Sequence, residues 1–313
     1  MTFPFEKKST PPRGAWTLAA VLMLMAGFLA GRPSRAQASV TSINLDNYSL
    51  TGIHRLPRGS DKAREASAVT YNWDTDTLFV VGDEGDALVE VSKTGQEISV
   101  MSLSGFDDTE GLTYVGNGQF VITEERIQDA FLLDYAAGGS VDRSSLAWAD
   151  LGSTVGNIGI EGISYNPSNS TFLTVKEKTP QQINVNTIDF SAGTAAVSSL
   201  FAADGLGVKD LSDIQILTTV GLDNNLLIFS QESALLMEVD MAGTLLSQFD
   251  FTGLSGSAEG VTIDRDGNIY VVSENGSAPL LYTLEANPVP VPGSVFLLGT
   301  ALAGLAGLVR RRN

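Results

Sequence analysis

Glutamates recur along this chain in one local setting, and their spacing points to chemistry that depends on carboxylates. Three of them stand directly before a glycine and a short apolar stretch, at Glu110, Glu161 and Glu259. Two further copies of this line begin at Ser67-Ala68 and Ser212-Asp213, so the five copies start 43, 51, 51 and 47 residues apart. Each copy has a second acid later on, and these acids are Glu84, Glu124 or Glu125, Glu177, Glu232 and Glu274. Grouped carboxylates can ligate a hard cation or exchange protons with a substrate.

The composition excludes most other site chemistries. The 313 residues contain no cysteine and one histidine, His54, which rules out disulfides, thiolate catalysis and multi-histidine metal sites. Residues 39–285 hold 11 basic and 35 acidic side chains, a net charge of −24. A surface of this sign repels nucleic acid and anionic lipid and attracts cations, so we expect no nucleic-acid partner.

The stretches around these acids have the pattern of β-strands. Each copy start is followed by a turn rich in Asn, Asp and Gly, such as Gly116-Asn117-Gly118, and then by a second strand such as Phe120-Val121-Ile122. Two more β-like runs complete most copies, and residues 39–285 show no long amphipathic helical period. Four strands in about 40–50 residues are typical of a propeller blade. The sequence therefore predicts an all-β fold, a five-bladed β-propeller over residues 39–285, with a six-bladed ring as the alternative.

The fifth copy leaves room for only three strands before residue 285. The stretch Leu50 to Leu56 precedes the first copy and has no partner of its own. We expect it to supply the outer strand of the last blade, because an open ring would leave two long unpaired edges. His54 would then lie far from the axis, which argues against a serine-histidine-aspartate triad.

The lines around the acids also resemble a known family. The pattern is carried by Phe106-Asp107-Asp108-Thr109-Glu110-Gly111-Leu112, by Ile160-Glu161-Gly162-Ile163-Ser164-Tyr165, and by Ala258-Glu259-Gly260-Val261 with the later Tyr270-Val271-Val272-Ser273-Glu274. Over roughly residues 60–285 the chain is similar to the SdiA-regulated proteins, which are distantly related to propellers of NHL repeats. The resemblance implies a five-bladed propeller with calcium bound at a shared site. The first and fourth copies depart from the pattern, so five equivalent carboxylates are not expected.

In a blade, the first strand lines the axis and the second runs antiparallel beside it. The start of the first strand and the end of the second therefore meet at one end of the ring. Oxygen ligands without His or Cys favour Ca²⁺ over Mg²⁺, and the predicted metal ligands are Glu110, Glu161, Glu259, Asp213, Glu125 and Glu274. Lys176 and Lys178 flank Glu177, so the third blade can balance charge internally. Two alternatives stay open, which are structural carboxylates that accept backbone N–H bonds from the next blade and a catalytic acid and base pair.

The N-terminus, residues 1–38, has the pattern of a signal peptide. Lys7, Lys8 and Arg13 precede a 15-residue apolar run, Trp16 to Ala30, and Ala36-Gln37-Ala38 is a small-x-small cleavage site. This pattern predicts a signal helix that is removed on export. An uncleaved anchor is the alternative.

The C-terminus, residues 286–313, has three parts. A proline spacer, Pro288-Val289-Pro290-Val291-Pro292, comes before 16 uncharged residues, Ser294 to Val309, and then Arg310, Arg311 and Arg312. This order predicts a membrane helix of about 24 Å with its basic end in the cytoplasm. It resembles the PEP-CTERM sorting signal, except that Val291 stands where that motif usually has Glu. The resemblance implies handling by an exosortase and delivery to the cell surface or an exopolysaccharide matrix. A plain inner-membrane anchor is the alternative.

Together these features predict an exported, surface- or matrix-associated calcium-binding propeller that acts as a binding module. Two other functions are alternatives. One is a metal-dependent hydrolase, such as a lactonase or esterase, with its site at the axial mouth, and the other is a purely structural matrix protein. The sequence identifies no catalytic residue.

Overall fold

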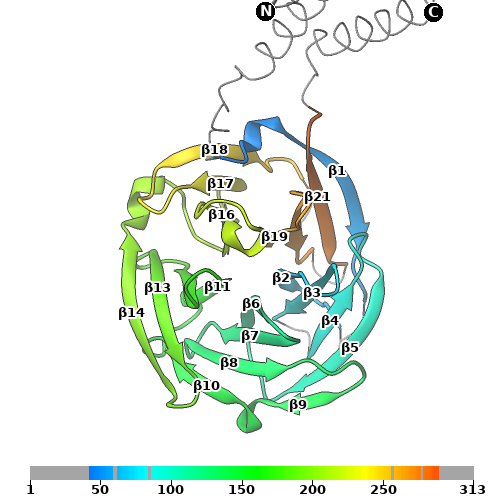
Figure 1. Ribbon diagram of the computed structural model, residues 1–313, viewed down its shortest axis with the longest axis vertical. Helices are drawn as coiled ribbons and strands as arrows, with labels where there is room; N and C mark the ends of the chain where they lie inside the picture. The colour runs from blue at the N-terminus through cyan, green and yellow to red at the C-terminus, as the bar shows by residue number, and fades with distance from the viewer. Residues whose placement is uncertain (1–41, 59–61, 84–85, 255–256, 276–277, 289–313) are drawn as a thin grey trace, which may run out of the picture. The chain divides into compact units, whose positions relative to one another are not determined.

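In the computed structural model, residues 42–58, 62–83, 86–254, 257–275 and 278–288 are described, and they form a ring of five sheets (Figure 1). In chain order the strands are β1 Tyr48–Arg55, β2 Ala66–Asn72, β3 Thr77–Gly82, β4 Ala87–Val91, β5 Glu97–Ser104, β6 Thr109–Gly116, β7 Gln119–Glu124, β8 Asp129–Asp134, β9 Ser140–Asp142, β10 Ala147–Asp150, β11 Ile160–Asn166, β12 Thr171–Lys176, β13 Gln182–Asp189, β14 Thr194–Phe201, β15 Asp213–Ile216, β16 Leu226–Ser230, β17 Leu235–Val239, β18 Leu245–Asp250, β19 Ala258–Ile263, β20 Ile269–Ser273 and β21 Leu280–Ala286. Four short 3₁₀-helices connect some of them, η1 Leu45–Asn47, η2 Arg143–Ser145, η3 Ala203–Leu206 and η4 Leu217–Val220.

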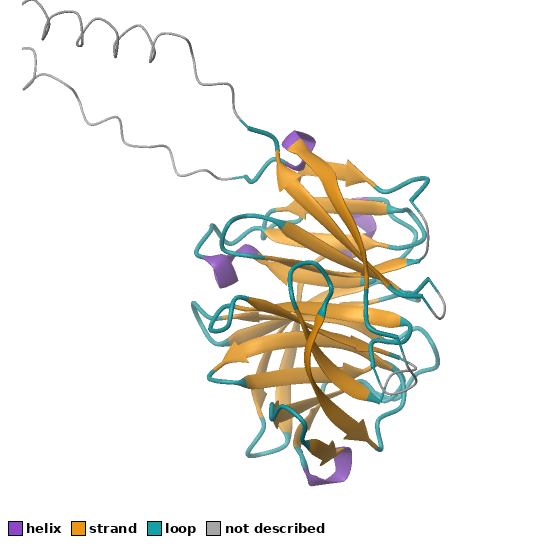
Figure 2. Cartoon of the chain, turned by 90° about the vertical axis from the view of Figure 1, so that its right-hand side faces the viewer, coloured by secondary structure: helices purple, strands orange, loops and turns teal. Residues whose placement is uncertain are grey.

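The prediction of five blades is confirmed, and the six-bladed alternative is wrong. The sheets contain β2-β3-β4-β5-β9, β6-β7-β8-β10, β11 to β14, β15 to β18, and β19-β20-β21-β1, which we number blades 1 to 5. All pairings are antiparallel except that of β9, which extends blade 1 by pairing in parallel with β5. Figure 2 shows the blades edge-on as successive layers of strands.

The ring closes between the two ends of the described chain, as predicted. Strand β1 pairs with β21 from Tyr48 opposite Ala286 to Arg55 opposite Leu280. This strand begins two residues before the expected Leu50 and ends one before Leu56. His54 lies on this outermost strand of blade 5, far from the axis. Closure removes the unpaired edges that a linear array of sheets would expose.

Apolar side chains fill the spaces between successive blades. The first strand of blade 1, β2, is buried along its whole length, because blades 2 and 5 cover its two faces. In contrast, the outer strand β14 is mostly exposed. Between blades 1 and 2, the rings of Phe79 and Phe120 lie 4.4 Å apart by their centroids. The inner strands are therefore held by packing on both sides.

Hydroxyl groups join the inner strands of neighbouring blades. Three residues after each copy start, a side-chain oxygen lies next to the inner strand of the following blade. At four of the five junctions this oxygen accepts a hydrogen bond from a backbone N–H, in the pairs Thr70 with Tyr114 (3.1 Å), Thr113 with Tyr165 (2.9 Å), Ser164 with Ile216 (3.0 Å) and Thr262 with Tyr71 (3.1 Å). At the remaining junction the Oε1 atom of Gln215 accepts from the hydroxyl of Thr262 at 3.0 Å. The repeat seen in the sequence is thus a repeat of contacts around the axis.

The Glu-Gly pairs lie at β-bulges. The register of the inner strand shifts across Glu110, across Glu161 and across Glu259-Gly260, so these residues have no partner in the second strand. A bulge re-aims a side chain that would otherwise follow the alternation of the strand. The glycine lets the next blade approach, since a Cβ atom at Gly162 would lie 2.7 Å from the Cα atom of Asp213. The pair therefore turns a carboxylate towards the axis while keeping the inner strands close.

Replacing Gly162 by alanine is expected to destabilise the ring. The added Cβ atom would meet backbone and side-chain atoms of Asp213 in blade 4, and overpacking of this kind costs about 1–3 kcal/mol or more. Chemical denaturation measures the free energy of unfolding. Gly156→Ala is the matched control, because nothing lies within 4 Å of its added atom. Equal stabilities of the two variants would contradict the close approach.

Both predicted terminal segments, the signal peptide at 1–38 and the membrane helix within 286–313, lie outside the described residues apart from 286–288. Within the described ranges, no helix has the length and apolar character needed to cross a bilayer.

Candidate metal centre

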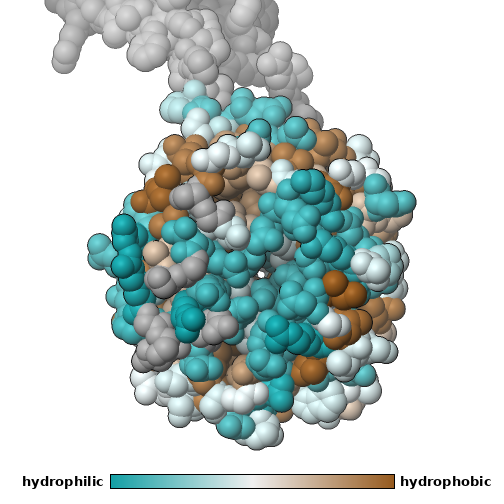
Figure 3. All heavy atoms as spheres, turned by 180° about the vertical axis from the view of Figure 1, so that it is seen from behind, coloured by the Kyte–Doolittle hydropathy of each residue, from teal (hydrophilic) through white to brown (hydrophobic). Residues whose placement is uncertain are grey.

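The structure gathers acids at the end of the ring where the inner strands begin. Glu110, Glu161 and Glu259 come from the bulges of β6, β11 and β19. Behind them, the first residue after the second strand is acidic in four blades, at Asp83, Glu125, Glu177 and Glu274. The backbone N–H of each of these four donates to a carbonyl group just before the inner strand, on Glu65, Asp108, Gly159 and Ser257 respectively. Hydrophilic residues surround the centre of the ring on this face (Figure 3).

Three sets of carboxylates lie close enough to share a cation. In each set the oxygens lie within 4.8 Å of one another. Two oxygens bound to one Ca²⁺ at about 2.3–2.6 Å can be at most about 5 Å apart, so these spacings fit. The sets are Asp83, Asp108 and Glu110; Glu125, Glu161 and Glu177; and Glu177, Asp210 and Glu232.

Glu110 has a carboxylate whose charge no described neighbour offsets. Among the described residues, no hydrogen-bond donor or cation contacts it. Burial raises its pKa well above the usual value, and the nearby charges of Glu259, Asp83, Asp108 and Glu125 raise it further. An enclosed carboxylate without a partner must take up a proton or bind a cation.

Two other inner acids have raised pKa values for the same reasons. Burial raises the pKa of Glu161 well above its usual range, with further contributions from Glu110, Glu125 and Glu177. Burial also raises the pKa of Glu259 to about 9, helped by Glu274 and other acids, although the side-chain amide of Gln231 donates to its carboxylate. In Glu125, the Oε1 atom accepts from the backbone N–H of Gly159 at 2.8 Å. The site thus holds more carboxylates than its own hydrogen-bond donors can stabilise in the ionised form.

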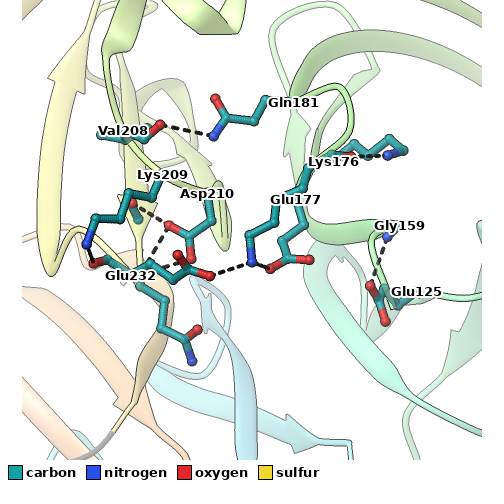
Figure 4. Close-up of polar contacts among 12 residues, drawn as sticks. Glu125, Gly159, Lys176, Glu177, Gln181, Val208, Lys209, Asp210 and Glu232 are labelled. Atoms are coloured by element: carbon teal, nitrogen blue, oxygen red, sulfur yellow. Dashed lines mark hydrogen bonds and ion pairs between the residues drawn. The ribbon is translucent and has the colours of Figure 1, made fainter. Parts of the chain in front are cut away.

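Two cationic side chains neutralise the edges of the cluster. The Nε atom of Arg126 lies 3.1 Å from a carboxylate oxygen of Asp108, whose pKa burial and Glu125 nevertheless raise to about 7. Between blades 3 and 4, the Nζ atom of Lys178 lies 2.5 Å from Glu177 and 2.6 Å from Glu232. Figure 4 shows Glu177, Asp210 and Glu232 around this ion pair. The ammonium group therefore bridges two members of the third carboxylate set, in line with the internal charge balance expected for blade 3.

Replacing Lys178 by glutamine is expected to open this third set to a metal ion. Without the ammonium group, Glu177, Asp210 and Glu232 would repel one another until a cation bound between them. Calorimetric titration with Ca²⁺ should then show an additional equivalent of binding. Lys209→Gln is the control, because the Nζ atom of Lys209 contacts only the backbone carbonyl of Glu232, at 3.2 Å. Equal binding by both variants would count against a latent cation site there.

Not every predicted ligand lies in these sets. Asp213 stands where the other copies have glycine, and its two oxygens accept the backbone N–H groups of Ile214 (2.7 Å) and Val261 (2.6 Å). It therefore joins blade 4 to blade 5, as in the structural alternative. Glu259 and Glu274 lie near each other at the same end of the ring but belong to none of the three sets.

The choice between the acids at the end of β7 is resolved by their contacts. Glu124 accepts from the backbone N–H of Asp107 and from the guanidinium of Arg143, whereas Glu125 lies beside Glu161. Glu84, the expected counterpart in blade 1, lies outside the described residues, and its neighbour Asp83 is the acid near Glu110.

Sequence reasoning missed three members of the cluster, Asp83, Asp108 and Asp210. Asp108 and Asp210 are buried in the segments that lead into β6 and β15. Both lie two residues before the start of their copy, which is a signal, but only one other copy has an acid at that position, Glu65. Glu177 and Glu232 were recognised as second acids without being proposed as ligands.

Several solved structures are similar to this chain. One is a protein of unknown function from Bacteroides caccae, with 14% identity and a TM-score of 0.40 over 63% of this chain and 65% of that one. Another is a catalytically inactive virginiamycin B lyase from Staphylococcus aureus with quinupristin, with 10% identity and a TM-score of 0.41 over 70% and 65%. A third is the WD40 β-propeller domain of Doa1, with 11% identity and a TM-score of 0.48 over 76% and 97%. The chain spans about 65% of the length of the first two.

A family model gives the wider relationship. The model described as SdiA-regulated matches residues 41–284, which include nearly all of the ring. This match covers well over half of the chain and contains the Glu-Gly pairs that begin at Glu110, Glu161 and Glu259. The chain therefore belongs to the SdiA-regulated family.

Proposed function

We propose that this protein is an exported, calcium-binding propeller that acts as a binding module at the cell surface or in an extracellular matrix. The observation that carries the calcium proposal is Glu110, a half-buried carboxylate with acids on several sides and no donor from the described residues. A divalent cation would relieve this repulsion while leaving the carboxylates ionised.

The donors at the axial end fit Ca²⁺ better than other biological cations. They are all oxygens, they come from several blades, and they lie in sets of three carboxylates whose oxygens are within 4.8 Å of one another. Transition metals would favour His or Cys, and Mg²⁺ would favour retained waters and a phosphate. We assign one ion to Asp83, Asp108 and Glu110 and a second to Glu125, Glu161 and Glu177, and we keep Glu259 and Glu274 as neighbouring candidates. The bound ions would supply positive charge that fixes blades 1, 2 and 3 relative to one another.

The proposed location rests on the two ends of the sequence. The signal-like segment at 1–38 and the proline, apolar and arginine segments at 286–313 favour export followed by at least transient anchoring in the inner membrane. An exosortase-type enzyme is the proposed processing partner, and an exopolysaccharide or surface ligand is the proposed binding partner. Fractionation of cells that express the chain with and without residues 286–313 tests this, since only the full chain should enter the membrane fraction.

Calorimetric titration of the purified protein, first stripped of metal, tests calcium binding. We expect saturable binding of Ca²⁺, much weaker binding of Mg²⁺, and a higher melting temperature with calcium. No heat and no thermal shift would reject the metal centre and favour purely structural carboxylates. Calcium-dependent turnover of lactones, phosphate esters or aryl esters that is lost in Glu110→Gln would instead favour the hydrolase alternative.

A further inference from the structure

A small open pocket lies on the outer part of blade 2, away from the axial acids. Strands β8 and β10 form one side, and the turn η2 forms the other. Its volume is about 220 Å³, and its lining residues are Ile127, Asp129, Phe131, Arg143, Ser144 and Trp148. This is smaller than the roughly 300–1,000 Å³ of sites for drug-sized ligands, so the pocket suits a single compact ring.

Trp148 gives the pocket an exposed aromatic face. Its side chain is 47% exposed, and it lies directly opposite Phe131 in the register of β10 and β8. Among the exposed large apolar side chains of the described residues it is the only aromatic one, the others being Ile53, Ile98, Val197, Leu222, Leu245 and Leu246. An indole ring offers a broad, rigid apolar surface at low cost in conformational entropy.

Arg143 presents fixed hydrogen-bond donors beside this surface. One of its terminal nitrogens donates to Glu124, and its guanidinium lies over the ring of Phe131, 5.7 Å from the centroid. Arginine has five N–H groups, and within the described residues the others meet no acceptor. The side chain is therefore held in place with donors left over.

Asp129 presents a hydrogen-bond acceptor in the same pocket. It is partly buried, and none of the described residues donates a hydrogen bond to its carboxylate. Burial raises its pKa to about 6, with Asp150 and Glu124 contributing and Arg143 opposing. An acceptor without a donor thus lies in the same small pocket as donors without acceptors.

We propose that this pocket binds a neutral pyranose ring. The apolar face of the sugar would stack on Trp148, and hydroxyl oxygens of the ring would accept from Arg143. Ring hydroxyls would donate to Asp129 and to the oxygen of Ser144, whose own O–H donates to Asp142. An anionic ligand would be repelled by three nearby acids, Asp129, Asp150 and Glu124. A neutral ligand that both donates and accepts satisfies all of these groups. This site is separate from the axial carboxylates, so it stands whether or not calcium binds there.

Tryptophan fluorescence of the whole protein tests the proposal, titrated with the methyl pyranosides of glucose, galactose, mannose and N-acetylglucosamine, and with methyl glucuronide. At least one neutral glycoside should give a saturable change in emission. Trp148→Ala should abolish binding, measured for that variant by ligand-observed NMR, and the isosteric Asp129→Asn should weaken it about tenfold or more. Ile98→Ala is the control, because Ile98 is 52% exposed on β5 and is not among the residues that line the pocket.

Two results would overturn the assignment. The first is that no neutral glycoside binds saturably to the folded wild-type protein. The second is that the folded variants Trp148→Ala and Asp129→Asn bind the neutral glycoside as tightly as the wild type does. Tighter binding of the glucuronide than of every neutral sugar would also overturn it. The titrations are run with calcium and with chelator, and equal sugar binding in both separates this result from the outcome at the axial centre.

Discussion

Glu110→Gln is expected to abolish the proposed calcium binding and, at the same time, to raise the melting temperature of the calcium-free protein. Glutamine keeps the shape of the side chain and removes the free-energy cost of protonating Glu110 on folding, since burial and nearby acids raise the pKa of this carboxyl well above its usual value. The loss in affinity should exceed the roughly 10–100-fold that removing an outer partner of a metal ligand costs. Calorimetry gives the affinity, and differential scanning calorimetry gives both melting temperatures.

Glu285→Gln provides the matched control, because Glu285 is exposed near the end of β21, and the variant should bind calcium like the wild type. A variant that loses calcium binding and yet melts at a higher temperature without calcium identifies Glu110 as a metal ligand and not as a structural carboxylate. If Glu110 only accepted structural hydrogen bonds, the glutamine variant would be less stable without calcium and no different from wild type in calcium binding.

The second large effect concerns pH. Without calcium, the protein should lose stability as the pH rises from about 4.5 towards about 9. In this window the folded ring holds protons that the unfolded chain has released, because burial and neighbouring acids raise the pKa of Glu259 to about 9 and those of Glu110 and Glu161 well above normal. Unfolding then releases protons, so the free energy of unfolding falls with rising pH. The contribution is complete below the unfolded pKa and is lost as the pH passes the folded one.

Calcium should reverse this trend. Bound carboxylates stay ionised, so each proton that the metal displaces makes the apparent affinity rise about tenfold per pH unit. Melting temperatures at about pH 5, 7 and 9, in calcium-free and calcium-saturated buffer, measure both effects. Asp76 and Asp264 have lowered pKa values and act only below this window. A calcium-free melting temperature that climbs across the range would refute the carboxylate crowding.

The ring could be predicted because its determinants are local and repeated. Turn residues and apolar runs recur in every copy, and a surplus strand at one end with a missing strand at the other leaves one way to close. The face on which Glu110 and Glu161 meet follows from strand direction alone.

The finer composition of the site could not be predicted, because it depends on single-residue offsets. Asp213, at the glycine position of its copy, was predicted as a metal ligand near the axial acids, but its two oxygens accept the backbone N–H groups of Ile214 and Val261. Asp108 and Asp210 belong to irregular segments whose course depends on tertiary packing. The bridge from Lys178 to Glu232 joins two blades, and its geometry follows from the angle between them.

The pairing of β1 with β21 has a consequence for how the protein is made. The two strands are separated by almost the entire ring in sequence, so their contact is among the most non-local in the molecule. The fifth blade cannot be completed until the ribosome has produced residue 286, and every shorter nascent chain carries two open strand edges. A chain stalled before that point is a candidate for chaperone capture or aggregation. Once residue 286 has been made, β21 can pair with β1, and this pairing completes blade 5 and closes the ring.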